Sequence, residues 1–268
     1  MQPIANQLNF AGGMPVSTLD SIDPSQYGLI ADILKKNPKA RLASLYGLRL
    51  FDSARVKAGT ALPTSEFELF ANPVGTQQTE LNGTTQYTKS FIDTNMRTTR
   101  QLPQGQEAWI TSIQVRVLIS GALDDSTQTG ANLGLANAPG IGSTLVAADD
   151  ALAVNLAQAA LEGIYLRFYY NSTVFEEGPL WGFPSRYGVS GFSGAAAYIP
   201  GTAGTTIMQN ETAINNGFGY VFRLPVVRHI DSLYQFSCTL QPYNNFVPTN
   251  NFRVQCILEG LGAKSVTG

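Results

Sequence analysis

One stretch of alternating side chains constrains the fold of this 268-residue chain more than any other feature. In the segment 102–120, LPQGQEAWITSIQVRVLIS, the polar residues Ser112, Gln114 and Arg116 share one parity. The apolar residues on the other parity are Trp109, Ile113, Val115, Val117 and Ile119. A period of two is typical of a β-strand with one buried face. The segment is therefore predicted to be a strand that covers a core.

Strand-like patterns recur elsewhere, at 65–73, 163–172, 233–242 and 251–260, and residues of the turn-forming types Gly, Pro and Asn separate them. Short strands with such punctuation predict an antiparallel sandwich or barrel. The long, turn-rich connections favour a jelly roll over a tight meander. The fold class expected from the residues is therefore all-β.

A few short helices are expected beside the strands. The first lies between Asp23, a candidate N-cap, and Pro38, which would stop it. Its expected apolar face consists of Tyr27, Ile30, Ala31 and Leu34. A second helix is predicted over 143–163, where Leu and Ala make a stripe and Gly163 can end it.

The composition argues against several classes of partner. Charged residues make up 13% of the chain, whereas about 25% is average. The densest basic group, Lys35, Lys36, Lys39 and Arg41, is not the basic stripe that a nucleic-acid groove needs. We expect no direct sequence-specific nucleic-acid binding. The N-terminal residues do not resemble a secretory signal, so synthesis in a cytoplasm is expected.

The single histidine offers little to an enzyme. His229 has Asp231 and Ser232 close by, but three residues so near in sequence on a strand cannot form a Ser-His-Asp relay. No nucleophile elbow of the G-x-S-x-G type stands in a strand-to-helix context. The sequence therefore predicts a structural or surface histidine and no catalytic residue.

Adjacent acids were weighed as glycosidase or metal residues. The pairs are Asp124 with Asp125, Asp149 with Asp150, and Glu176 with Glu177. Neighbouring side chains point apart on a strand or a helix, so no pair is a ready acid and base. Asp124, Asp125, Glu176 and Glu177 could hold a structural Ca²⁺, although they lack EF-hand spacing. No other cofactor or metal is expected.

The remaining candidates leave alternatives open. Cys238 and Cys256 are predicted to be two buried thiols, with cross-strand neighbours as the other possibility. Sequons at Asn82, Asn171 and Asn210 matter only on a secretory route. Aromatic residues near 169–175, 179–187 and 241–246 could stack on sugars, or could pack against a neighbouring subunit.

A faint internal echo hints at duplication. The segment that begins LPQGQEAWITSIQVRVL has a counterpart in LPVVRHIDSLYQFSCTL, which begins at Leu224. Each has a Leu-Pro pair, a polar interval and an alternating strand. Between them lies 178–206, rich in Gly, Pro and aromatic residues, which could link two β units or form one long loop.

The residues resemble a known family. The segments 48–83, 87–117, 161–192, 222–240 and 252–264, with the short signals DTNM and LPQGQ, look like parts of the major capsid proteins of tailless icosahedral bacteriophages. The similarity extends over about residues 45–262. It implies a vertical jelly roll, most like the double jelly roll of corticoviruses and related membrane-containing phages.

The resemblance implies an architecture and a function. It implies an N-terminal arm and helix at 1–45, a first eight-stranded barrel at 46–185 and a second at 186–268. Such a chain would be a structural virion protein, not an enzyme, that assembles as pseudo-hexameric homotrimers into an icosahedral shell. Its partners would include a vertex protein and, in some viruses, an internal membrane.

Two alternatives remain beside this expectation. Since 268 residues are compact for two barrels, a single jelly roll from about Asn95, preceded by a helical and β arm, is the alternative fold. The alternative function is a β-sandwich module that binds carbohydrate or attaches to a host.

Overall fold

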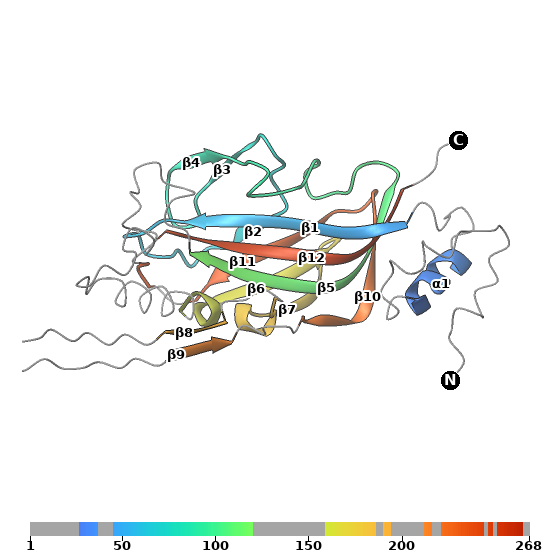
Figure 1. The fold of residues 1–268 in the computed structure, drawn as a ribbon. Helices are drawn as coiled ribbons and strands as arrows, with labels where there is room; N and C mark the ends of the chain where they lie inside the picture. Colours follow the sequence, from blue (N-terminus) through green and yellow to red (C-terminus); the bar gives the residue numbers. More distant parts are fainter. Residues whose placement is uncertain are drawn as a thin grey trace, which may run out of the picture.

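The protein folds into two antiparallel sheets that face each other (Figure 1). The computed structural model describes residues 27–36, 45–119, 159–185, 190–193, 212–215, 221–243, 246–248 and 251–264. The first sheet has the order β1 (Leu45–Val56), β12 (Phe252–Lys264), β5 (Gln106–Ile119) and β10 (Arg223–Asp231). The second has the order β2 (Phe67–Leu69), β11 (Phe236–Pro242), β6 (Ile164–Tyr170) and β7 (Thr173–Pro179).

These eight strands pair as one long nested hairpin. β6 pairs with β7, β5 with β10, β2 with β11, and β1 with β12, all antiparallel. Additional pairs join β12 to β5 and β11 to β6. As a result, strands from the segments 46–185 and 186–268 lie side by side in both sheets.

Two short hairpins and short helices lie outside the two main sheets. One hairpin consists of β3 (Gln77–Thr79) and β4 (Gln86–Thr88), and another of β8 (Ser190–Ser193) and β9 (Thr212–Asn215). Helical segments in the described part of the chain include α1 (Tyr27–Lys36), the short 3₁₀ helix η6 (Leu180–Gly182) and residues 159–163. The prediction of an all-β protein with a few short helices is confirmed.

The helix predictions can be compared over the described residues. The first helix is confirmed as α1, while its expected cap Asp23 and stop Pro38 lie outside the described residues. Of the second, only the last turn at 159–163 is described, and it is helical. No helix in the described part of the chain is long and apolar enough to span a membrane.

Alternating side chains build the core between the sheets, as the sequence predicted. On β11, Phe236, Cys238 and Leu240 are almost fully buried and the residues between them are half-buried. Ile164, Leu166 and Phe168 follow the same pattern on β6. Because both sheets contribute to one cluster of apolar side chains, the interior is a single core.

A β-bulge corrects the predicted parity of Trp109. Ser112 lies opposite Glu259, but Ile110 lies opposite Gly260, so Thr111 is an extra residue on β5. The bulge reverses the faces beyond it, because an inserted residue shifts the period-two pattern by one position. Ile110 therefore joins the core between the sheets, and Trp109 faces outward.

A side chain at Gly260 would strain this bulge. A Cβ placed on Gly260 would lie 1.8 Å from the backbone oxygen of Trp109, closer than any atoms can pack. Any other residue would have to displace backbone rather than a flexible side chain.

α1 covers the outward Trp109. Ile30 and Ile33 pack with Trp109, Leu261 and Ala263 in a small second cluster on the first sheet. The predicted apolar face of this helix was therefore right for Ile30 but omitted Ile33, while Ala31 is only half-buried. The side chains of Tyr27 and Leu34 lie outside the described residues.

Candidate functional site

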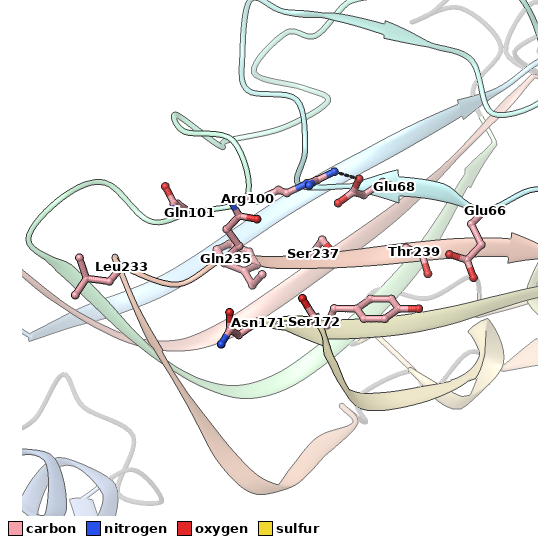
Figure 2. A pocket seen from close by; sticks show the side chains of 12 residues that line it. Glu66, Glu68, Arg100, Gln101, Asn171, Ser172, Leu233, Gln235, Ser237 and Thr239 are labelled. Atoms are coloured by element: carbon pink, nitrogen blue, oxygen red, sulfur yellow. Dashed lines mark hydrogen bonds and ion pairs between the residues drawn. The ribbon is translucent and has the colours of Figure 1, made fainter.

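A polar groove lies on the outer face of the second sheet (Figure 2). Its volume is about 580 Å³, and its walls come from β2, β11, β6 and the turns beside them. The residues used below are Glu66, Glu68, Arg100, Tyr169, Leu233, Ser237 and Thr239. The groove is therefore built mainly on strands, with turn residues at its ends.

The alternation of β11 explains the hollow. Phe236, Cys238 and Leu240 point into the core, so Ser237 and Thr239 must point outward. Their short side chains leave space between the bulkier neighbours on β2 and β6. The same pattern that fills the core therefore opens a depression on the opposite face.

Ion pairs balance the charges around the groove. Arg100 pairs with Glu68, as Figure 2 shows. Arg167, on the same sheet, pairs with Glu66 at 2.5 Å and with Glu177 at 3.2 Å. With hydroxyls, compensated charges and the ring of Tyr169, the groove suits a neutral polar ligand or a polypeptide loop. Its described lining contains no histidine, lysine or cysteine.

The histidine that the sequence singled out lies elsewhere, on the outer face of the first sheet. The ring of His229 stacks on Trp109 with 4.9 Å between ring centroids. Its Nε2 lies 2.9 Å from Oε2 of Glu107. Asp231 instead accepts hydrogen bonds from Ser232 Oγ at 3.3 Å and the Leu233 amide at 3.0 Å. The structure therefore does not bring His229, Asp231 and Ser232 together as a relay.

The acid pairs do not converge either. Glu177 is bound by Arg167, and Glu176 lies opposite Phe168 on the neighbouring strand. Asp124, Asp125, Asp149 and Asp150 lie outside the described residues. Within the described ranges, no group of three or more His, Cys, Asp or Glu side chains could hold a metal ion. The structural Ca²⁺ stays a prediction.

Two sequon asparagines have clear surroundings. Asn82 is buried, and its side chain accepts from the Lys57 amide and donates to the carbonyls of Lys57 and Thr60. The Asn82 side chain therefore fixes the backbone of the loop that runs from Lys57 to Thr60. Asn171 is exposed at the β6–β7 turn with a φ of 47° and lines the groove. Asn210 lies outside the described residues.

The two cysteines are buried thiols, as predicted. Their Sγ atoms lie 3.8 Å apart, with Cys238 on β11 and Cys256 on β12. They are therefore neighbours between the two sheets rather than within one. Burial raises the pKa of the Cys238 thiol, because the thiolate would lose its hydration.

A buried charged cluster at the β1 edge was missed by sequence reasoning. Asp52 on β1 and Lys89, directly after β4, have side chains with 0% exposure, and Lys89 Nζ donates to Asp52 Oδ1. Asp52 also accepts from the amides of Ser53 at 2.9 Å and Phe70 at 2.6 Å. These contacts join β1 to the segment that carries the β3–β4 hairpin.

A second buried aspartate lies beside the first. Asp93 accepts from Arg55 Nε at 3.1 Å and Nη2 at 3.0 Å, a forked contact, and Arg253 Nε lies 3.9 Å away. Ser90 donates to it from its amide and its hydroxyl. Burial raises the pKa of Asp93, but the hydrogen bonds from Arg55 and Ser90 outweigh burial and hold it below its usual value.

One signal in the sequence could have revealed this cluster. In LRLFDSARV, Asp52 shares its parity with Leu48, Leu50, Ala54 and Val56, so an acid stands on the face that should be buried. A buried carboxylate requires a partner. The partner, Lys89, lies 37 residues away and has no periodic signal of its own.

Comparison with known proteins adds no relative. No protein-family model, no curated protein and no solved structure matches this chain.

Proposed function

We propose that this chain is a structural virion protein, the major capsid protein of a tailless icosahedral bacteriophage, and that it folds as a single jelly roll. The single observation that carries the proposal is the strand order of the two sheets. A long hairpin rolled into two facing four-stranded sheets is a jelly roll, an architecture common in viral capsids. The nested pairing from β6–β7 outward to β1–β12 fits this description.

The same pairing favours one barrel over two. A tandem of barrels would pair strands of 46–185 among themselves, whereas here β12 lies between β1 and β5. A capsomer with hexagonal outline needs six barrels. Three copies of a two-barrel chain supply them as a pseudo-hexameric trimer, whereas a one-barrel chain must supply six copies. The single jelly roll therefore predicts a hexamer, or a trimer that contains three barrels and has no hexagonal outline.

The surface supports assembly as the working property. Several large apolar side chains are more than half exposed on the described surface: Phe91, Ile92, Trp181, Val226, Leu233, Tyr243 and Val247. Leu233, with 77% exposure, lies at one end of the groove. Exposed apolar groups in a chain with few charges suit burial against neighbouring subunits.

The test is the mass of the purified protein, measured by light scattering over a concentration series and followed by electron microscopy. Trimers, hexamers or closed shells are expected, because a coat protein buries its surface against copies of itself. A monomer at every concentration would contradict the proposal.

A pair of variants would locate the contacts. Leu233→Asp places a charge on the large apolar side chain that is most exposed in the described part of the protein, and it is expected to lower the assembled fraction without unfolding the monomer. Thr84→Asp adds the same charge at an exposed polar turn and serves as the control. Equal effects of the two variants would argue against an interface at the groove.

A carbohydrate-binding or host-attachment module is the second candidate, and the groove favours it. Jelly rolls also serve as lectins, and Tyr169 with the hydroxyls of Ser237 and Thr239 could contact a sugar. Binding on a glycan array that Tyr169→Ala abolishes would support this candidate. Binding unaffected by Tyr169→Ala, or no binding to the array, would count against it.

A further inference from the structure

The buried Asp52–Lys89 pair places an amine against a carboxyl group inside the protein. Both side chains have 0% exposure, and Nζ of Lys89 is in hydrogen-bond contact with Oδ1 of Asp52. The residues are 37 positions apart and come from β1 and the chain just after β4. Neither the proposed coat function nor the groove makes use of this pair.

Burial favours the uncharged forms of both groups. The pKa of Asp52 is raised and the pKa of Lys89 is lowered, in each case chiefly because burial removes water from the charged form. The attraction between the two groups opposes these shifts. A proton that moves from Nζ to the carboxylate produces a neutral amine and a neutral acid in contact, which are a nucleophile and its electrophile.

We propose that Lys89 and Asp52 condense into an amide, so that the folded chain forms its own internal cross-link. The lone pair of Nζ attacks Cγ of Asp52, and a C–N bond forms. The C–Oδ1 bond then breaks, and Oδ1 leaves as water with one proton from Nζ and the carboxyl proton. One amine and one acid become one amide and one water, and no oxidant, metal or cofactor is consumed.

The surroundings of Asp52 suit this step. The Phe70 amide donates to Oδ2 at 2.6 Å, so it stabilises the negative charge that develops on this oxygen during attack. The Ser53 amide donates to Oδ1 at 2.9 Å, on the oxygen that would leave. Because both donors are backbone groups, their positions are already set before reaction.

Phe70 itself is held in an unusual conformation. Its φ is 66°, in the left-handed region that a bulky residue seldom adopts, and its side chain is fully buried against Phe236 with 5.6 Å between ring centroids. The packing therefore maintains a backbone conformation that aims the Phe70 amide at Asp52.

Folding supplies the proximity, and burial makes the product favourable. Two groups fixed in contact react as if at very high concentration. In water, an ammonium and a carboxylate do not condense, because ionisation stabilises them. In the core, burial favours the neutral amine and the neutral acid that react, and their product is a neutral amide that needs no compensating charge. The cross-link would attach the β3–β4 segment permanently to β1.

The test is mass spectrometry of the folded, full-length protein. The expected intact mass is lower than the sequence mass by one water, and digestion should yield a branched peptide that joins Lys89 to Asp52. Lys89→Met should restore the full sequence mass. Lys57→Met, the matched control, changes an exposed lysine directly after β1 and should leave the protein lighter by one water.

Two results would overturn the inference. One is a wild-type protein of full mass whose Lys89 and Asp52 appear in separate, unmodified peptides, which is decisive even if the variants fail to fold. The other is a water-loss product that reacts with hydroxylamine, because a succinimide at Asp52–Ser53 also lacks one water but is opened by this reagent to a hydroxamic acid, while an amide cross-link does not react.

Discussion

The centre of the sandwich and its β1 edge are buried to a similar extent but are packed with different chemistry. At the centre, Leu240, Leu258 and the two cysteines belong to one cluster of buried apolar side chains. At the edge, Asp52 and Asp93 are held by cations and amide groups. Apolar packing is tolerant of small shifts, whereas an ion pair needs one geometry. The comparison teaches that the core supplies stability and the edge specifies where the β3–β4 segment docks.

The largest effect is expected from removal of the acid at the edge. Asp93→Ala removes a fully buried carboxylate and leaves the half-buried guanidinium of Arg55 without its forked partner, and the expected loss is about 3–5 kcal/mol of unfolding free energy. Urea denaturation measures the loss. Glu68→Ala breaks the more exposed pair with Arg100 and should cost about 1 kcal/mol or less. Equal losses of unfolding free energy in the two variants would show that the buried ion pair at the β1 edge contributes no more to stability than the exposed pair.

A deletion at the centre tests the other half of the comparison. Leu240→Ala empties space between the sheets and should lower the unfolding free energy by about 2–5 kcal/mol. Because no charge is involved, the loss should be the same at pH 4 and pH 7. A loss that depends strongly on pH, measured by urea denaturation at both values, would show that centre and edge are coupled.

The bulge that separates the two faces of β5 should be less costly to disturb. Gly260→Ala forces a methyl group against the backbone oxygen of Trp109, and overpacking of this kind costs about 1–3 kcal/mol. Trp109 fluorescence should change in the folded state, because the ring would shift under α1. Gly47→Ala, on β1 with open space around its Cα, is the matched control. An unchanged spectrum with full stability would contradict the bulge.

The smallest expected effect is on how the unfolding free energy depends on acidic pH. The pKa of Asp93 is lower in the folded protein than in the unfolded chain, so its ionised form contributes stability that is complete above the ordinary value of about 4. This contribution is lost as the pH falls through the lower folded pKa. Asp93→Asn should therefore flatten the decline of unfolding free energy below about pH 4. A decline as steep as in the wild type would exclude Asp93 as its source.

Local pattern predicted much of the fold but not the bulge. The alternation at Phe236, Cys238 and Leu240 identified a strand and its buried face, because burial on a sheet follows a period of two. The same rule placed Trp109 on the inner face of β5, which was wrong, because the extra residue Thr111 reverses the inner and outer faces of the strand at the bulge. The pairing of β12 between β1 and β5 depends on long-range contacts that a single strand pattern does not encode.

The candidate sites were harder to predict than the strands. The groove depends on small residues of β11 that meet Tyr169 and Arg100 only after folding. Asp52 did carry a signal, an acid on an apolar parity, but nothing near Lys89 marks it as the partner. His229 attracted attention as the single histidine, and the structure pairs it with Glu107 at the surface. Rarity of a residue type is therefore a poorer guide than a mismatch between charge and expected burial.

The central position of β12 has a consequence for synthesis. The ribosome makes residues 252–264 after every other described strand, yet this strand supplies both neighbours of its sheet, β1 and β5, with their hydrogen-bond partners. While the nascent chain is still being extended, β1 and β5 cannot complete their ladder. Contacts over such long sequence separations also slow folding. The first sheet is thus completed only after residues 252–264 have been made, which would keep shorter nascent chains from being built into larger structures.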